Sequence, residues 1–406
     1  MLHYLRFYSI PLVGLLVSGL MLFGGIWLWL PGFAWVALVS SLDQIFPHDI
    51  LEEPYRHPFF LDLALYLSTP AALALYFALF WVAGSGAQDA LHIGSALQSW
   101  TGVDVIAARN NTATYHYVLM FLTLGMLFTG VGGLAGHELT HRTWRPFDLW
   151  LGRMTMALNW GIAFPIEHVY GHHSYVGTSK DPATAARGDS VYQHLPKALK
   201  RTVVNAVALE KQRLAKTGKA FLSPSNVLLR MGLISSATTA FAYIWAGWMG
   251  VLFHVIACCL TKFWLEVLNY VEHYGLIRVP TQPVQPRHSW NCNHVVSGVM
   301  TYNLTRHSHH HADAQVPFQE LRSHSEQPSM PDGLVSSLLY ALIPPLWHAK
   351  IAPKLLEWDR TQADRSEYPL IQAANKASGW QELQQSIANT VVKPDTSAIA
   401  QGGLGY

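Results

Sequence analysis

The chain has 406 residues, of which 50% are hydrophobic and only 13% are charged. A composition this apolar is unusual for a soluble protein and typical of a chain with several membrane spans. The formal net charge of +2 provides no bulk attraction for nucleic acid, so we expect no nucleic-acid partner. The three cysteines (Cys258, Cys259 and Cys292) form no C-x-x-C pair, which argues against a fused rubredoxin-type iron site or zinc ribbon.

Apolar runs long enough to cross a hydrocarbon core of about 30 Å recur along the chain. The first run has no small-residue cleavage signal behind it, and we interpret it as a retained membrane helix. A second run is short, but Pro31 and Gly32 predict a tight turn that sends the chain straight back. We therefore expect six spans in three hairpins, the last turning near Gly247 to Gly250, with the spans at about 9–30, 33–46, 59–83, 115–136, 229–249 and 250–272.

Basic residues predict the orientation of these spans, because loops rich in lysine and arginine stay in the cytoplasm. Residues 141–230 carry 13 of the 27 basic residues and five acidic ones, whereas residues 84–114 contain only Arg109. The expected fold is an all-α integral membrane protein with six transmembrane helices and a cytoplasmic helical cap. One membrane-embedded domain would cover residues 1–375, with cytoplasmic segments 137–228 and 273–375, followed by a polar tail at 376–406.

Ten of the 21 histidines fall in four short boxes, all on the predicted cytoplasmic side. HELTH places His137 and His141 at i and i+4 on one helix face, as two ligands of one metal require. EHVYGHH repeats that spacing with His168 and His172 and adds His173, which points about a quarter of a turn away. In this interpretation the spaced pair serves one metal and the neighbouring ring serves a second.

The remaining two boxes are NYVEHYG and RHSHHHAD. His273 stands at the cytoplasmic end of the last predicted span. His307, His310 and His311 repeat the pattern of a spaced ring followed by an adjacent pair, so His309 is the spare ring that points off the ligand face. Nine rings are too many for one tetrahedral zinc. Divided over two ions they give four or five ligands each, which leaves positions open for oxygen and suits iron.

Carboxylates stand beside the rings, and we expect them to accept ring N–H groups and so fix the tautomers. They are Glu138, Glu167, Glu272 and Asp313. For Asp313 a merely solvated role is an equal alternative.

Together these boxes resemble those of the membrane di-iron hydrocarbon monooxygenases, the alkane 1-monooxygenase and xylene monooxygenase group of the fatty-acid desaturase and hydroxylase superfamily. NYVEHYGL is the most specific segment, and HSWNCNH (288–294), DPAT (181–184) and IPPLW (343–347) extend the resemblance over almost the whole chain. It implies two non-haem irons, O2 as co-substrate and no catalytic residue beyond the metal site. The implied ligands are His137, His141, His168, His172, His173, His273, His307, His310 and His311.

The resemblance also implies a location in a bacterial-type inner membrane and a hydrocarbon substrate. Two electrons would come from a separate rubredoxin or ferredoxin with its NAD(P)H reductase. An acidic carrier could bind the basic stretch 187–219, although these residues could equally serve only to keep the loop in the cytoplasm.

The substrate stays open between two types within this group. Glu167 before His168 and Glu272 before His273 look more like the alkane enzymes, whereas FYSIPLVGL (7–15) and AANKASGW (373–380) look more like the xylene type. We expect hydroxylation of the terminal methyl of a medium-chain alkane to the primary alcohol. Methyl hydroxylation of alkyl-aromatics, or a fatty-acid or lipid desaturase-hydroxylase activity, are the alternatives.

Large side chains in the first three spans could set the depth of the substrate channel, and Trp35 and Phe77 are the candidates, with ordinary packing as the alternative. Two other classes of protein are disfavoured. An intramembrane zinc protease needs HExxH and only one further ligand, which leaves most of these rings unexplained. A metal transporter would need ligands along a path through the membrane, whereas these gather on one side.

Overall fold

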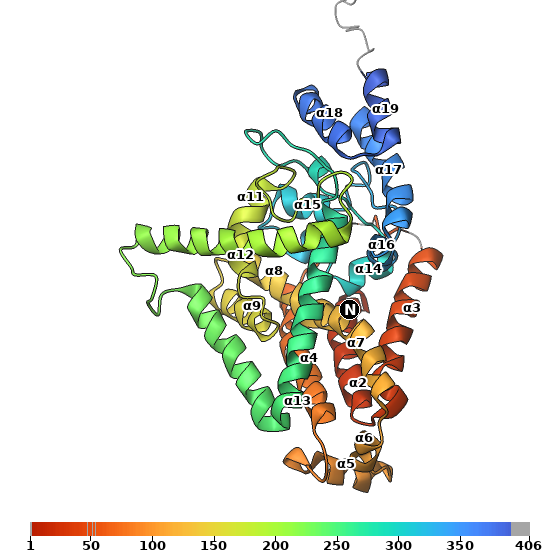
Figure 1. The fold of residues 1–406 in the computed structure, drawn as a ribbon, viewed down its shortest axis with the longest axis vertical. Helices are drawn as coiled ribbons and strands as arrows, with labels where there is room; N and C mark the ends of the chain where they lie inside the picture. Colours follow the sequence, from red (N-terminus) through yellow and green to blue (C-terminus); the bar gives the residue numbers. More distant parts are fainter. Residues whose placement is uncertain (1, 47, 51, 53, 391–406) are drawn as a thin grey trace, which may run out of the picture.

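The computed structural model describes residues 2–46, 48–50, 52 and 54–390, and within them every named element is a helix, with loops between and two isolated β-bridges. Figure 1 shows long helices that run along the long axis at one end and a layer of shorter helices at the other. Four helical segments are long and apolar enough to cross a membrane: His3–Met21, Pro58–Ala83, Thr114–His141 and Val227–Glu272. The predicted all-helical fold with several apolar helices is thus confirmed. These four segments do not by themselves show the six predicted spans.

The long-axis bundle contains helices from the first two thirds of the chain, with three short helices at its far end. The bundle elements are α1 (Leu2–Leu5), η1 (Arg6–Tyr8), α2 (Ser9–Met21), η2 (Gly25–Leu28), α3 (Leu30–Ile45), α4 (Pro58–Ala83), α7 (Thr114–Phe128), η4 (Thr129–Leu134), α8 (Ala135–His141) and α13 (Val227–Glu272). Those at the far end are η3 (Ala90–His92), α5 (Ile93–Thr101) and α6 (Val105–Asn110).

The opposite layer, called the cap from here on, holds the remaining elements. They are α9 (Pro146–Leu158), α10 (Phe164–Glu167), η5 (His168–His172), α11 (His173–Tyr175), α12 (Val191–Lys216), η6 (Pro286–His288), α14 (Val295–Met300), α15 (His307–Ala312), η7 (Phe318–Glu320), α16 (Leu334–Ala341), α17 (Pro344–Thr361), η8 (Arg365–Glu367), α18 (Tyr368–Ala377) and α19 (Gln381–Thr390). Helix α18 crosses position 375, and residues 391–406 of the predicted tail lie outside the described residues.

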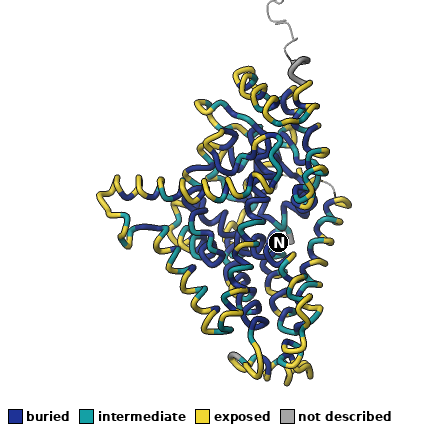
Figure 2. The backbone as a smooth tube through the Cα atoms, viewed as in Figure 1, coloured by how far each residue is buried: buried dark blue, intermediate teal, exposed yellow. Residues whose placement is uncertain are grey.

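The outer faces of the bundle are apolar. Leu16 is 61% exposed, Ile244 77% and Trp248 75%, and Figure 2 shows the buried residues concentrated along the middle of the molecule. Such a surface would be costly in water and is favourable against lipid chains. The multiple apolar helices therefore indicate an integral membrane protein.

The first turn of the chain lies earlier than the sequence predicted. Helix α2 ends at Met21, and the reversal follows at Gly24 and Gly25, whose φ values of 66° and 53° favour glycine. Pro31 instead lies in the first turn of α3, where its missing N–H costs no hydrogen bond. The predicted turn at Pro31 and Gly32, and with it a first span that runs to residue 30, was wrong.

The last apolar segment bends back on itself. Within α13 the backbone leaves the helical region at Ala246 and Gly247, and the φ of 60° at Gly247 again requires a glycine-like conformation. Figure 1 shows the two arms of α13 as a V that points away from the cap. The reversal predicted near residues 247–250 is present, one residue earlier than expected.

Helix α12 crosses the long axis where the bundle meets the cap (Figure 1). Ser190 begins it with a capping box, in which its hydroxyl accepts from Gln193 N–H and the Gln193 side chain accepts from Ser190 N–H. A stripe spaced mostly four residues apart is buried on one face, including His194, Ala198 and Thr202. The other face carries the exposed basic residues of this segment. The helix thus places a row of cations along the rim of the cap.

Close packing inside the bundle gives a prediction for stability. A Cβ on Gly125 of α7 would lie 2.5 Å from Leu260 Cβ of α13, and real atoms do not approach so closely. We expect Gly125→Ala to destabilise the protein by about 2 kcal/mol, because the two helices must separate. Gly19→Ala is the control, since nothing lies within 4 Å of its Cβ position. Thermal unfolding in detergent measures both, and equal melting temperatures for the two variants would contradict this account.

Candidate metal centre

The first histidine box lies at the cap end of a bundle helix. The π-helix η4 leads directly into α8, which carries His137 and His141 one turn apart, with ring centroids 4.8 Å apart. The predicted i and i+4 spacing therefore does place both rings on one face. Both side chains are buried.

The second box folds differently from the prediction, because its backbone is a π-helix. Within η5 the His173 N–H donates to the carbonyl of His168, five residues back. Residues five apart then share a face, and the Nε2 atoms of His168 and His173 lie 3.2 Å apart. His172 points to a different set of rings. The prediction that His168 and His172 pair on one metal, with His173 apart, was wrong for this reason.

The third and fourth boxes complete the centre from two further segments. His273 follows the last residue of α13, and α15 carries His307, His310 and His311. The Nε2 atoms of His273 and His307 lie 3.0 Å apart. The Nε2 atom of His311 lies 3.2 Å from that of His172. All of these rings except that of His173 are buried, and His173 is partly exposed.

The nine rings form two adjoining clusters. In each group of candidate ligands the nitrogen or oxygen atoms lie within 4.8 Å of one another. The first group, cluster one, is His137, His141, His168, His173 and His310. Two smaller groups, His172 with His273 and His311, and Glu272 with His273 and His307, share His273 and are together called cluster two. The rings of His173 and His311 stack across the boundary with centroids 4.2 Å apart. The structure thus brings together every predicted ligand, in groups of five and four rings.

The donor set fits metal ions better than it fits hydrogen bonding. Within the described part of the chain, His141 Nε2, both ring nitrogens of His310 and Glu272 Oε1 are buried with no hydrogen-bond partner. Buried polar atoms are rarely left in this way, because each costs about 1–3 kcal/mol. A metal ion would satisfy them together. The site therefore has the chemistry of a di-metal site, and the identity of the metal is taken up below.

The protonation state of the rings agrees with this assignment. Burial, helped by the neighbouring rings, lowers the pKa of His168, His173, His310 and His311 well below the usual value for imidazole. Burial also lowers the pKa of His307 to about 3. These rings are neutral near pH 7, and the neutral imidazole nitrogen is the form that binds a metal.

Asp181 is a partner of the centre that the sequence analysis did not assign. Both of its oxygens lie 2.9 Å from Nδ1 of His172, and only 1% of the residue is exposed. Burial alone would lower the pKa of His172, but the carboxylates of Asp181, Glu167 and Glu266, with Asp181 the strongest, together offset this and raise the pKa. The contact fixes Nε2 of His172 as the nitrogen that faces the cluster. The DPAT motif contains Asp181, but only the fold brings it to His172.

The four predicted carboxylates have different surroundings. Glu138 accepts from Nε and Nη2 of Arg142, at 3.1 and 3.0 Å, rather than from a ring. Glu167 is contacted by Asn205 Nδ2 at 3.4 Å, and burial raises its pKa to about 7. Glu272 lies 3.4 Å from Nε2 of His307, whereas Asp313 is exposed. Of these four carboxylates, only Glu272 therefore lies beside a clustered ring.

The spare histidine and the two aromatic candidates are also placed by the fold. His309 lies outside both clusters, and its Nδ1 accepts from the Arg322 backbone N–H at 2.8 Å. Trp35 lines an apolar cavity of about 50 Å³ together with Leu134 and Leu268, which precede His137 and His273 on their helices. Phe77 does not line that cavity and packs edge-on against Trp245, with centroids 5.2 Å apart.

Comparison with known proteins assigns the class. A family model described as "Fatty acid desaturase" matches residues 112–336, which include all nine clustered rings from His137 to His311. The chain is 34% identical over 383 residues to the xylene/toluene monooxygenase hydroxylase component XylM of Pseudomonas putida, covering 93% of this chain and 95% of the relative. The chain belongs to the fatty acid desaturase family.

Its place within the family follows from further relatives. It is 38% identical over 259 residues to alkane 1-monooxygenase 1 of Pseudomonas aeruginosa, covering 61% of this chain and 67% of the relative. It is 30% identical over 349 residues to the alkane 1-monooxygenase of Ectopseudomonas oleovorans, covering 82% and 80% of the two chains. The protein is thus an oxidoreductase of the alkane and xylene monooxygenase group, which confirms the resemblance seen in the histidine boxes.

The contact between Asp181 and His172 can be tested by metal analysis. We expect Asp181→Asn to weaken metal retention about tenfold or more under a chelator challenge, because the neutral amide no longer holds the ring as the carboxylate does. His309→Ala should retain metal like the unaltered protein, since its ring lies outside the clusters. Mass-spectrometric metal counts per chain provide the measurement. Equal retention in both variants would remove Asp181 from the centre.

Proposed function

We propose that the protein is a membrane di-iron monooxygenase that converts the terminal methyl of a medium-chain alkane into the primary alcohol. The observation that carries this proposal is the convergence of nine rings, eight of them buried, from four segments at the end of an apolar helical bundle. The reaction consumes one O2, two electrons and two protons and yields the alcohol and water. A bound pair of iron ions would supply the activation of O2.

The nine clustered histidines would hold the two ions, and ligand number and type favour iron over zinc. A zinc site takes four ligands when closed and three when open, so nine rings are too many for one zinc and five in cluster one exceed what a zinc site needs. Imidazole is a good ligand for iron, and burial lowers the pKa of His310 and His311 so that these rings are neutral, as binding requires. With no other acid or base needed beside the metals, we assign no further catalytic residue.

The chain's own contribution to the reaction is to position the methyl and to exclude water. The cavity beside Trp35 is apolar, and one of its lining residues, Leu134, lies one helical turn before His137 of the first cluster. A hydrocarbon that dissolves in the bilayer would reach this cavity between helices without passing through water. Held there by shape alone, it would present a chain end to the metal centre.

The membrane arrangement that suits this function has six crossings. These are α2, α3, α4, the continuous segment α7 to α8, and the two arms of α13, with the cap in the cytoplasm of a bacterial-type inner membrane. The excess of basic residues in 141–230 supports this orientation. We further propose that residues 1–375 form the membrane-embedded enzyme domain and 376–406 a polar tail.

A second candidate function is hydroxylation of a methyl group on an aromatic ring. The alignment with the xylene/toluene component covers 93% of this chain, whereas the alignment with the P. aeruginosa alkane enzyme covers 61%. Coverage thus favours the aromatic type, while the higher identity of 38% favours the alkane type.

Product analysis separates these functions. Cells that express the chain with both a rubredoxin and a ferredoxin system, each with its NAD(P)H reductase, would receive octane, hexadecane and p-xylene together. We expect primary alcohol from octane in the gas chromatogram. Benzylic alcohol alone would assign the aromatic function instead. Folded, iron-loaded protein with no hydroxylated product would exclude both and direct the test to lipid substrates.

The role of Trp35 can be tested in the same assay. We expect Trp35→Ala to raise the ratio of hexadecane to octane product about tenfold, because a deeper cavity accepts a longer chain. Phe77→Ala is the matched control, since its ring contacts Trp245 and not the cavity. A similar change in both variants would show that loss of an aromatic ring, rather than cavity depth, controls the ratio.

A further inference from the structure

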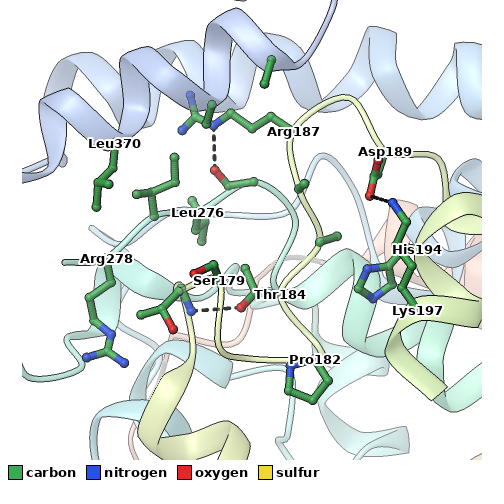
Figure 3. A pocket seen from close by; sticks show the side chains of 18 of the residues that line it. Ser179, Pro182, Thr184, Arg187, Asp189, His194, Lys197, Leu276, Arg278 and Leu370 are labelled. Carbon is green, nitrogen blue, oxygen red and sulfur yellow. Dashed lines mark hydrogen bonds and ion pairs between the residues drawn. The ribbon is translucent and has the colours of Figure 1, made fainter. Parts of the chain in front are cut away.

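A second pocket lies among elements of the cap and shares no lining residue with the cavity beside Trp35. It measures about 430 Å³ and opens between the loop 177–189, the loop 275–280 and helix α18 (Figure 3). Its apolar wall includes Leu276, Leu370 and Ala374. In Figure 1 helix α18 lies in the cap, far from the end of the bundle that carries α5 and α6. The pocket thus faces the aqueous side of the protein under the proposed topology.

The rim of this pocket is strongly basic. Its lining includes Arg187, Lys197, Arg201 and Arg278, and Asp189 is the one carboxylate among the lining residues. Arg187 is buried and paired with Asp359. Lys197 bonds Asp189 at 2.9 Å, yet 61% of its side chain is exposed. The rim therefore offers accessible positive charge to an approaching partner.

The two other cations, the exposed Arg201 and the buried Arg278, are held by backbone carbonyls instead of carboxylates. Arg201 donates to Ser179 O at 2.6 Å. Arg278 donates to Val176 O and Ser174 O, both at 2.8 Å. Carbonyl oxygens orient a guanidinium but leave its charge uncancelled. The pocket combines an apolar wall with a positive rim, which is the arrangement of a docking site for an acidic protein.

A short hydrogen-bonded path connects the pocket with the ring clusters. Thr184 lines the pocket, and its hydroxyl donates to Asp181 Oδ2 at 2.6 Å. Asp181 in turn contacts His172 Nδ1 at 2.9 Å, and His172 belongs to the second cluster. Only two side chains, those of Thr184 and Asp181, therefore lie between the pocket surface and a predicted ligand.

From these observations we infer that this pocket is where the electron donor docks, and that the donor is a small acidic iron protein. Its acidic face would contact Lys197 and Arg201, and one apolar side chain would enter the pocket beside Ala374. The inference rests on the proposed function, which requires two electrons per turnover. A donor whose iron changes from ferrous to ferric supplies one electron per visit, so two visits complete one reaction and the protons come from water.

Binding of a carrier to the full-length protein in detergent tests this inference without requiring activity. The probes are oxidised rubredoxin and, separately, a [2Fe–2S] ferredoxin, with Kd measured by calorimetry at low and high salt. We expect Lys197→Glu with Arg201→Glu to raise the Kd about tenfold or more, and salt to weaken binding to the unaltered protein. Lys216→Glu with Lys219→Glu changes the net charge equally, at exposed positions outside the pocket, and should leave the Kd unchanged.

A second pair of variants tests the pocket itself rather than its charge. Ala374→Trp fills the apolar wall and should raise the Kd, whereas Ala373→Trp adds the same ring at an exposed position of α18 that does not line the pocket. Metal content and melting temperature, measured for every variant, show that each is folded.

The outcomes separate this inference from the proposed function. Equal weakening by both charge-reversal pairs, or equal Kd values for the two tryptophan variants, would overturn the docking site. Failure of the unaltered protein to bind either carrier would also overturn it. So would an anionic phospholipid that displaces the carrier and that no longer binds when Ala374→Trp fills the pocket. A protein that binds the carrier as expected but forms no hydroxylated product would retain the docking site and lose the proposed function.

Discussion

Nine imidazole rings packed into one space, eight of them buried, are the constraint on which the rest of this structure depends. Each ring must keep its orientation although it has few hydrogen-bond partners within the described chain, so the backbones that carry the rings must be rigid. Buried ionic contacts provide part of that rigidity. Arg142 joins Glu138 of α8 to Asp62 of α4 and Asp148 of α9, with distances of 3.0, 2.5 and 3.1 Å.

Buried ionic contacts also hold the segments around the second cluster. Arg187 ties the loop after η5 to Asp359 of α17, and its Nε donates to Gly275 O two residues beyond His273. Charged residues whose burial costs desolvation free energy thus hold the segments next to the ligands. Buried pairs of this kind contribute little net stability and instead fix geometry, because breaking one leaves an uncompensated charge.

The extent of sequence prediction can be judged from particular residues. The spacing of His137 and His141 was sufficient, because their helix is α-helical at that point. The spacing of His168 and His172 was misleading, because a π-helical hydrogen-bond pattern is not visible in a side-chain pattern. Asp181 and Arg142 act through partners that only the tertiary fold brings near. The early turn at Gly24 was missed because the nearby proline gave the stronger signal, although proline also begins helices.

The two π-helical segments, η4 and η5, give the centre an unusual dependence on chain length. Each contains one more residue than an α-helix of the same rise would accommodate, and each immediately precedes or contains ligand residues. Removing a single residue from either segment would let it relax into an α-helix of the same rise and leave the part beyond it in place, whereas adding a further residue would rotate everything beyond it by about 100°. Substitutions in these segments can therefore be tolerated where their side chains fit, whereas insertions would disperse the rings. Growth of this part of the chain is restricted in length far more than its sequence is restricted.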